Sequence, residues 1–385
     1  MEPSSGNAMN KLELTGVRKT FGDTVALGDV NLNLREGEFL SLLGPSGCGK
    51  STTLDLVAGF QHPDRGSIRV DGADVNGKSP RERQIGIVFQ DYAIFSHLRV
   101  RDNLAFGLEA RRVGRAERKR RVTRMAEQLG LEDILDRKGK TLNMSEMQRV
   151  ALARVLIVEP ELLLLDEPMS NLDAVVRESL RTELKQIQTT LNQTVLYVTH
   201  DQSEALSLSD RIAVMDQGEL LQIGAPEDIY ANPRTLFVAK FIGDPPMNII
   251  NAEVHAAEPT AAELECGITL DLGNHRLEPG TYHLGIRPHH VAFTRDTTAD
   301  VFYGETVFAE NFGYEWITHV DCLTCTVRVA AQQPGGDPGK SLGIRLDLAQ
   351  AHLFDGKTGR SLGTYWRRGA RLLARGNPES RQGIQ

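Results

Sequence analysis

A glycine-rich stretch near the N-terminus has the residue types and the spacing of a phosphate-binding loop. Residues 44–52 read G-P-S-G-C-G-K-S-T and contain the pattern G-x-x-x-x-G-K-[ST]. In this pattern backbone N–H groups surround a polyphosphate, Lys50 reaches the β- and γ-phosphates, and the Ser51 hydroxyl is placed for Mg²⁺. The residues expected to contact the nucleotide are Gly44, Ser46, Gly47, Gly49, Lys50, Ser51 and Thr52.

The sequence on both sides of this phosphate loop supports the prediction. Residues 38–43 have the apolar character of a buried strand, and residues 52–58 begin a helix whose N-terminal dipole favours an anion. A glycine-rich turn that matched the pattern by accident would not need these flanks. The sequence therefore predicts that the chain binds a nucleoside triphosphate.

Two further polar sites each follow an apolar run. Asp166 and Glu167 follow four leucines, and His200 follows the run T-V-L-Y-V-T at residues 194–199. Asp166 can hold Mg²⁺, usually through water, and Glu167 can polarise a water for in-line attack on the γ-phosphate, which His200 can contact. An acidic turn or a single strand-end histidine is often structural. Because open α/β sheets bind ligands at the carboxyl ends of their strands, however, one nucleotide site can use all three motifs.

The elements that must position these groups alternate in type. From about residue 12 to residue 241, strand-like runs alternate with amphipathic helical stretches, which predicts an α/β core with a largely parallel sheet. Residues 91–158 lack strand-like runs and are rich in arginine and leucine at helical spacing, which indicates a helical insertion. We therefore expect a nucleotide-binding domain over residues 11–243.

The character of the chain changes after the G-D-P-P sequence at residues 243–246. Short β-rich segments follow at residues 268–272, 282–286, 306–309, 316–321, 326–330 and 343–348. This spacing predicts a small all-β barrel or sandwich over residues 244–370. The polar residues 371–385 are expected to form a flexible tail.

Composition and charge speak against some classes of protein. With 40% hydrophobic and 25% charged residues, the 385-residue chain has the composition of a soluble globular protein. Its net charge of −7 argues against a nucleic-acid binder held by bulk positive charge, so no nucleic-acid partner is expected. The basic run at residues 111–121 has no interleaved aromatic residues, and we interpret it as a solvated helix face.

Cysteine usage and apolar segments bear on the compartment. Four cysteines in a chain of this length show no disulfide framework, which favours a reducing compartment. We interpret Cys322 and Cys325 as ordinary strand residues rather than half of a zinc site. The polar start of the chain predicts no secretory signal, and no apolar run reaches the roughly 20 residues that span a bilayer. We expect a cytoplasmic protein unless another subunit carries it to a membrane.

Together with Gln90, the three motifs resemble the ATP-binding subunit of ABC transporters. The resemblance implies ATP and Mg²⁺ as cofactors, ATP hydrolysis, and a P-loop ATPase fold. It implies that Phe21 stacks on adenine and that Gln90 senses Mg²⁺ and the attacking water. It also implies that Ser51, Gln90 and Asp166 are the metal ligands.

The same resemblance assigns the remaining catalytic roles. Glu167 matches the general base and His200 the switch histidine, and both act with Gln90. Residues 170–173, which include Asn171, match the loop that crosses between two subunits. Residues 95–103 lie where the family receives the coupling helices of its transmembrane subunits.

The C-terminal half narrows the resemblance to importers. Residues 241–248, 284–289 and 352–355 look like the OB-like regulatory β-domain of importers for sugars, polyols or glycerol phosphate. Residues 88–92 also resemble polyamine and iron importers. The resemblance implies a peripheral subunit at the cytoplasmic face of the plasma (inner) membrane, with permease subunits as direct partners and an extracytoplasmic binding protein as an indirect one. Alternatives are a regulatory subunit that binds ATP with little hydrolysis, and an ABC-type ATPase acting on DNA or ribosomes.

One motif departs from the family. The family signature L-S-G-G-Q-x-Q-R-V reads L-N-M-S-E-M-Q-R-V at residues 142–150, so Asn143 replaces the serine and Glu146 the glutamine. Met144 and Ser145 replace the two glycines. In the family, two subunits dimerise head to tail, and this helix N-terminus meets the γ-phosphate held by the other subunit. We expect Met144 to obstruct the approach and Glu146 to bring a negative charge toward the anion, whereas Asn143 can still cap the helix.

Two arrangements remain open for the dimer. In one, the chain forms a homodimer whose altered signature is adequate. In the other, it pairs with a second ATP-binding subunit whose signature is intact. We favour the heterodimer, because the chain keeps Lys50, Asp166, Glu167 and His200, which implies that its own site is still used.

Overall fold

The computed structural model describes residues 10–170, 172–296, 298 and 300–374. The chain forms two compact units, which divide between Glu227 and Asp228 rather than at Gly243, where the sequence predicted the boundary. The buried guanidinium of Arg287 donates to the carbonyl oxygens of Tyr230 and Ile242 and lies 4.0 Å from the ring centroid of Tyr230. These contacts tie the segment that contains α7 (Pro226–Ala231) and α8 (Leu236–Phe241) to the β-rich second unit.

The first unit is built around a six-stranded sheet with the order β10-β9-β3-β8-β7-β6. The neighbours from β9 through β6 are parallel, and β10 is antiparallel to β9, so the largely parallel sheet is confirmed. The strands are β3 (Phe39–Leu43), β6 (Ile85–Val88), β7 (Leu162–Asp166), β8 (Val195–Thr199), β9 (Arg211–Asp216) and β10 (Glu219–Gly224).

Strands β3, β7 and β8 are apolar because both faces of the sheet are covered. In β7, Leu162 and Leu164 pack into one hydrophobic cluster, whereas Leu163 and Leu165 pack into a second cluster on the other face. The same alternation holds along β8. A run of residues buried on both sides is typical of parallel strands.

A second, antiparallel sheet covers one face of the first. Its order is β2-β1-β4-β5, with β1 (Asn10–Phe21), β2 (Thr24–Arg35), β4 (Arg65–Val70) and β5 (Ala73–Asp74). The sequence predicted the strands of the α/β core but not their division into two sheets. Helix α1 (Lys50–Ala58) shares one hydrophobic cluster with strands of both sheets.

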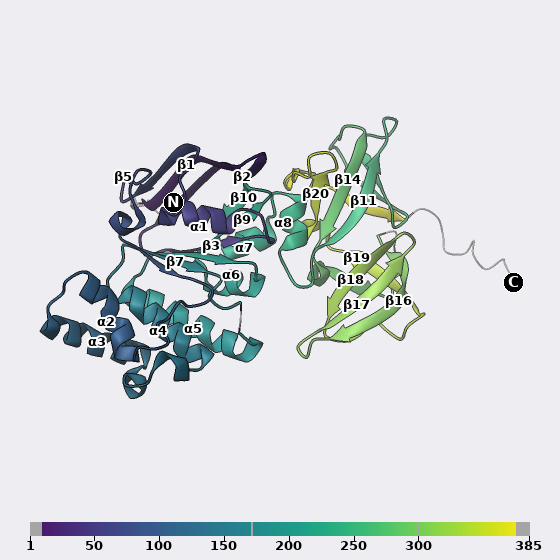
Figure 1. Ribbon diagram of the computed structural model, residues 1–385. Coiled ribbons are helices and arrows are strands. Elements are labelled where there is room, and N and C mark those ends of the chain that lie inside the picture. The colour runs from purple at the N-terminus through teal and green to yellow at the C-terminus, as the bar shows by residue number, and fades with distance from the viewer. Residues whose placement is uncertain (1–9, 171, 297, 299, 375–385) are drawn as a thin grey trace, which may run out of the picture. The chain divides into compact units, whose positions relative to one another are not determined.

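Helices α2 to α6 gather on the opposite face of the central sheet from α1 (Figure 1). Residues 91–158, all of which the structure describes, contain α2 (Val100–Ala110), α3 (Arg115–Leu129) and α4 (Met144–Leu156) and no strand. Helices α5 (Ala174–Leu191) and α6 (Gln202–Leu208) follow β7 and β8. In the basic run at the start of α3, Glu117 pairs with Arg120 and Arg121, each at 2.8 Å.

The second unit contains two antiparallel sheets, as an all-β domain requires. Their orders are β20-β14-β11-β12-β13-β21 and β15-β19-β16-β17-β18. Residues from both sheets form one hydrophobic cluster. The strands are β11 (Asn248–Val254), β12 (Ala261–Leu264), β13 (Ile268–Asp271), β14 (Gly280–Ile286), β15 (Val291–Thr294), β16 (Phe302–Asn311), β17 (Trp316–Cys322), β18 (Cys325–Ala331), β19 (Ser341–Leu346), β20 (His352–Asp355) and β21 (Arg371–Ala374).

Two expectations for the second unit meet different outcomes. Cys322 ends β17 and Cys325 begins β18, so both are strand residues as expected, and their thiols are free. The sequence predicted a flexible tail from residue 371, but residues 371–374 form β21, because Leu372 packs into the hydrophobic cluster of this unit. Residues 375–385 lie outside the described residues.

Candidate functional site

The order of the strands brings the four predicted sites to one edge of the central sheet. Strands β3, β8, β7 and β6 are consecutive neighbours and run parallel, so their carboxyl ends lie side by side. The phosphate loop follows β3, His200 follows β8, Asp166 ends β7, and Gln90 comes shortly after β6. The topology thus explains why motifs far apart in the sequence can serve one ligand.

The phosphate loop is shaped by glycines that no larger residue could replace without strain. A Cβ atom at Gly44 would lie 2.3 Å from the carbonyl oxygen of Met215 on the neighbouring strand. Gly49 caps α1 with φ of 104° and lies so close to β2 that a Cβ atom would meet the carbonyl oxygen of Ala26 at 2.7 Å. The loop therefore wraps tightly into α1, whose first N–H groups have no partner within the helix.

Lys50 is folded back across the loop. Its ammonium donates to the carbonyl oxygens of Gly44 (2.9 Å) and Pro45 (3.0 Å), and the residue is only 5% exposed. A buried ammonium next to the backbone N–H groups of the loop can balance the negative charge of a polyphosphate. Ser46, Gly47 and Ser51 are exposed on the same loop and can contact a ligand directly.

The carboxylates near the loop carry more negative charge than their surroundings balance. Burial raises the pKa of Asp166, and the carboxylates of Glu167 and Asp55 raise it further, against the opposing effect of Lys50. Burial also raises the pKa of Asp55, which lies one turn after Ser51 in α1 and which the sequence did not suggest as a site residue. A divalent cation would relieve this repulsion, so these residues fit Mg²⁺.

Few protein ligands are needed to hold Mg²⁺. The described part of the chain holds no group of three or more histidine, cysteine, aspartate or glutamate side chains that could bind a metal ion. Mg²⁺ is usually held by one or two carboxylates together with substrate phosphates and water. Asp166 and the Ser51 hydroxyl offer a partial site of this kind.

Glu167 and His200 are in direct contact. The Nδ1 atom of His200 lies 3.0 Å from Oε2 of Glu167. Glu167 has φ of 43°, an unusual conformation for a residue other than glycine, and its N–H donates to the carbonyl oxygen of Val198 (3.0 Å). The pair therefore has a fixed place at the sheet edge, where a carboxylate can polarise water and an imidazole can contact a phosphate.

Phe21 and Gln90 lie at the surface. Phe21 ends β1, is 49% exposed, and has the ammonium of Lys19 at 5.4 Å from its ring centroid. An exposed ring of this kind can stack on a base. Gln90 is exposed after β6. Their roles at the nucleotide stay predictions.

Ser170 and Asp173, in the segment expected to cross between subunits, each form a hydrogen bond within the chain. The Ser170 hydroxyl donates to the carbonyl oxygen of Glu167 (2.9 Å), and Asp173 caps α5 by accepting from the N–H of Val176 (3.0 Å). Asn171 lies outside the described residues. Ser170 is thus hydrogen-bonded to the backbone of the predicted base.

The altered signature forms a self-contained helix start. Asn143 caps α4 by accepting from the N–H of Glu146, whose carboxylate in turn accepts from the N–H of Asn143, each at 2.9 Å. Arg137 donates to the same carboxylate at 2.8 Å. The sequence predicted that Glu146 would bring a negative charge toward a phosphate, but this charge is already paired. Met144 is 38% exposed at the first position of the helix.

Comparison with known proteins agrees with this geometry. Residues 27–170 match the ABC transporter family, and residues 284–354 match the TOBE domain. The xylose/arabinose import ATP-binding protein XacJ of Haloferax volcanii is 44% identical over 366 residues, which cover 91% of this chain and 95% of that protein. This chain belongs to the ABC transporter family.

Other members support the same assignment. The maltose/maltodextrin import ATP-binding protein MalK of Yersinia pestis bv. Antiqua is 39% identical and covers 90% of this chain and 96% of its own length. The sn-glycerol-3-phosphate import ATP-binding protein UgpC of Psychromonas ingrahamii is 37% identical, with 92% and 96% covered. The solved structure of cbiO1 from Clostridium perfringens, part of an ABC transporter complex, is 30% identical with a TM-score of 0.55, covering 58% of this chain and 91% of that chain. The chain is thus an ABC-type ATPase of the import class with a C-terminal β-domain.

Proposed function

We propose that this chain is the ATP-hydrolysing subunit of an importer for a sugar, a polyol or glycerol phosphate. The contact between Glu167 and His200 beside the phosphate loop is the main observation that supports ATP hydrolysis as the activity. The printed names of the relatives, which concern xylose and arabinose, maltodextrins and glycerol 3-phosphate, support this solute class.

The chemistry proposed for the site is a direct attack of water on the γ-phosphate. Lys50 and the N–H groups of the loop hold the phosphates, and Glu167 accepts a proton from the attacking water while His200 contacts the γ-phosphate. Mg²⁺ would be held by Ser51 and Asp166, with Gln90 nearby, and would neutralise charge on the phosphates. No covalent intermediate is required, because positioning and charge stabilisation suffice.

An uptake measurement tests this function. We expect deletion of the gene to abolish uptake of one radiolabelled solute among xylose, maltose, glycerol 3-phosphate and sugar alcohols. Wild-type protein should restore that uptake, Glu167→Gln should not, and a matched change at the exposed Glu178 on α5 should behave as wild type. Unchanged uptake of all these solutes would contradict the proposed solute class.

A surface near Gln90 supports docking of permease subunits. Phe95 packs against Phe106 with ring centroids 4.6 Å apart, and the guanidinium of Arg154 lies 4.6 Å from the Phe95 ring centroid. The side chain of Asn103 bonds both the N–H (2.8 Å) and the carbonyl oxygen (3.0 Å) of Phe95. Phe106 is 47% exposed, so this well-packed aromatic cluster presents an apolar surface to which a short helix of another subunit can bind.

This docking places the chain at a membrane without crossing it. Among the residues that the structure describes, no helix is long and apolar enough to cross a bilayer. We therefore propose a peripheral position at the cytoplasmic face of the inner membrane, held by permease subunits. An extracytoplasmic binding protein would act only through that permease.

The altered signature supports a second ATP-binding subunit. The exposed Met144 side chain stands where a phosphate would have to approach the start of α4, and the N–H of Glu146 already donates to Asn143. Both features weaken closure of this helix over a partner's ATP. The intact site of this chain would instead be closed by the partner's signature.

Repair of the signature distinguishes the two dimers. The purified chain alone should hydrolyse ATP slowly, and changing residues 143–146 to S-G-G-Q should raise turnover. Rapid turnover by the wild-type homodimer, unchanged by the repair, would contradict the heterodimer. Slow turnover both alone and with the permease would instead support the regulatory alternative.

A further inference from the structure

Arg177 contacts three residues of the first unit: Leu172, Asp201 and Glu204. It lies in the first turn of α5, just after the loop at residues 170–173. Its Nη2 donates to the carbonyl oxygen of Leu172 at 3.0 Å, and its Nη1 donates to the carboxylate of Asp201 at 2.8 Å. Its Nε lies 3.8 Å from Oε1 of Glu204.

The third contact involves a buried carboxylate. Glu204 is 3% exposed, and its Oε2 accepts from the hydroxyls of Tyr197 (2.7 Å) and Thr199 (2.6 Å). Burial, and then the nearby Glu204, hold the pKa of Tyr197 well above its usual value, so this hydroxyl stays a donor. A carboxylate buried this deeply needs a cation, and Arg177 is the cation in contact with it.

The same network holds the segment that carries His200. Asp201 directly follows His200, and its N–H donates to the Thr199 hydroxyl at 3.0 Å. The carboxylate of Asp201 also caps α6 by accepting from the N–H groups of Ser203 (2.7 Å) and Glu204 (3.2 Å). The residues on either side of His200 are therefore fixed through Arg177 and Glu204.

We propose that Arg177 is a positioning residue that ties Leu172 to Asp201, the neighbour of His200, and so sets the contact between His200 and Glu167. The planar fork of a guanidinium reaches a carbonyl oxygen and a carboxylate at once, which a lysine ammonium does not do with the same geometry. A displacement of Leu172 is then passed through Arg177 to Asp201 and to the neighbouring histidine. The consequence for turnover rests on the proposed function, in which a partner subunit contacts the loop at residues 170–173.

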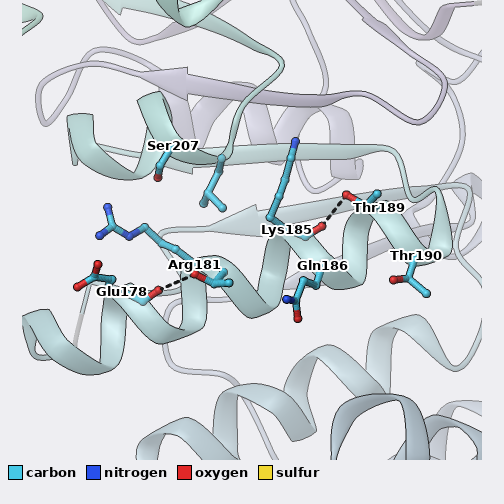
Figure 2. Close-up of a pocket in the computed structure, with 9 residues that line it drawn as sticks. Glu178, Arg181, Lys185, Gln186, Thr189, Thr190 and Ser207 are labelled. Atoms are coloured by element: carbon cyan, nitrogen blue, oxygen red, sulfur yellow. Dashed lines mark hydrogen bonds between the residues drawn. The ribbon is translucent and has the colours of Figure 1, made fainter.

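A control residue lies one turn further along the same helix. Arg181 lines a groove of about 580 Å³ between α5 and α6, together with Glu178, Lys185 and Ser207 (Figure 2). Predicted site residues are not among those that line this groove. Arg181→Gln therefore removes the same charge from the same helix without touching the network of Arg177.

The first test uses the full chain and needs no transporter. Ring-nitrogen chemical shifts of the histidines are recorded by NMR, with His200 identified from the spectrum of His200→Gln. We expect Arg177→Gln to shift the His200 signals, Arg177→Lys to shift them less, and Arg181→Gln to leave them in place. Unmoved His200 signals in Arg177→Gln, or equal shifts in the Arg181 variant, would overturn the proposal.

A double variant covers loss of folding. Removing Arg177 alone leaves the carboxylate of Glu204 buried without its cation, which can unfold the protein. Arg177→Gln with Glu204→Gln removes both charges, so the fold is kept while the link to Leu172 and Asp201 is lost. The His200 signals of this variant should shift relative to those of Glu204→Gln alone, and identical signals in the two variants would overturn the proposal.

The second test measures turnover in the complex with its permease. We expect Arg177→Gln to lower kcat about 10- to 100-fold with the KM for ATP changed by less than about 3-fold, because a small misplacement of a catalytic group costs this much. A raised KM with unchanged kcat would overturn the proposal. If the His200 signals shift as expected while no complex transports a solute, the proposed function fails and the role of Arg177 stands.

Discussion

His352 in the second unit links the stability of that unit to pH. It begins β20, is 5% exposed, and its Nδ1 lies 3.4 Å from Nη2 of Arg367. Burial, and then the charges of Arg367 and Arg287, lower its pKa from 6.5 to about 4. The imidazole is therefore neutral in the folded protein at pH 7.

The sign and the size of the effect follow from this lowered pKa. Between pH 6.5 and pH 4 the unfolded chain binds a proton at His352 that the folded chain does not. The stabilising contribution of this histidine is thus fully present above pH 6.5 and is lost as the pH falls toward 4. The whole shift corresponds to about 3 kcal/mol, of which about 2 kcal/mol is lost between pH 7 and pH 5.

Unfolding of the full chain can be followed for this unit alone. Both tryptophans of the chain, Trp316 and Trp366, lie in the second unit, so their fluorescence reports its unfolding. From pH 7 to pH 5, we expect the wild type to lose about 2 kcal/mol more than His352→Gln does. For a unit of this size that difference corresponds to about 4–8 °C in Tm.

The comparison isolates His352 from other titrating groups. Burial also lowers the pKa values of His283 and His290, but their effects occur in both proteins and cancel. His255→Gln, a change at an exposed histidine of the same unit, should keep the wild-type pH dependence. If His352→Gln lost as much stability as the wild type, to within about 0.5 kcal/mol, the buried neutral histidine would be refuted.

Three further predictions concern the nucleotide site. Glu167→Gln should lower ATP hydrolysis about 10²- to 10⁴-fold, measured by phosphate release, while fluorescent ATP still binds; unchanged hydrolysis would contradict a general base. Gly44→Ala should abolish the rise in Tm that ATP produces, because the new Cβ would lie 2.3 Å from the carbonyl oxygen of Met215. Phe21→Ala should weaken ATP binding about 5- to 30-fold in a titration, since stacking on a base contributes about 1–2 kcal/mol, and GTP and ATP should be affected alike.

The residues proposed for catalysis stand out in the sequence because each lies next to a recognisable run of residues. The phosphate loop is contiguous, Asp166 ends an apolar strand, and His200 directly follows another. Parallel pairing of those strands then brings them together without further information. The common position of these residues at one sheet edge therefore follows from the local pattern and the topology together, while their roles stay predictions.

Residues that act through long-range contacts could not be found in this way. In the sequence, Asp55 resembles any polar residue of an amphipathic helix. Only the structure shows that burial raises its pKa and that its charge raises the pKa of Asp166. Arg177 and Glu204 are 27 positions apart in numbering, and only the packing of α5 against α6 joins them. Their types at these positions carried no signal, because arginine and glutamate are common on exposed helix faces.

The division into two compact units differs from the predicted boundary for a related reason. The G-D-P-P sequence at residues 243–246 is a strong turn signal, yet the division falls earlier, between Glu227 and Asp228. A domain boundary depends on where contacts end rather than on where the chain turns. The buried Arg287, which bonds carbonyl oxygens on both sides of α8, moves that point.

Glu146 and Met144 of the altered signature differ in how far each opposes phosphate binding. Replacement of glutamine by Glu146 looks unfavourable to phosphate binding, but its carboxylate accepts from the N–H of Asn143 and pairs with Arg137. Its charge is therefore balanced by Arg137, so electrostatic repulsion is the weaker obstacle. The exposed side chain of Met144 has no such compensation, because bulk at the first helical position blocks the backbone from a ligand whatever the charges nearby. Steric exclusion at Met144, rather than charge at Glu146, is thus the main reason to place a different subunit's helix over this chain's ATP.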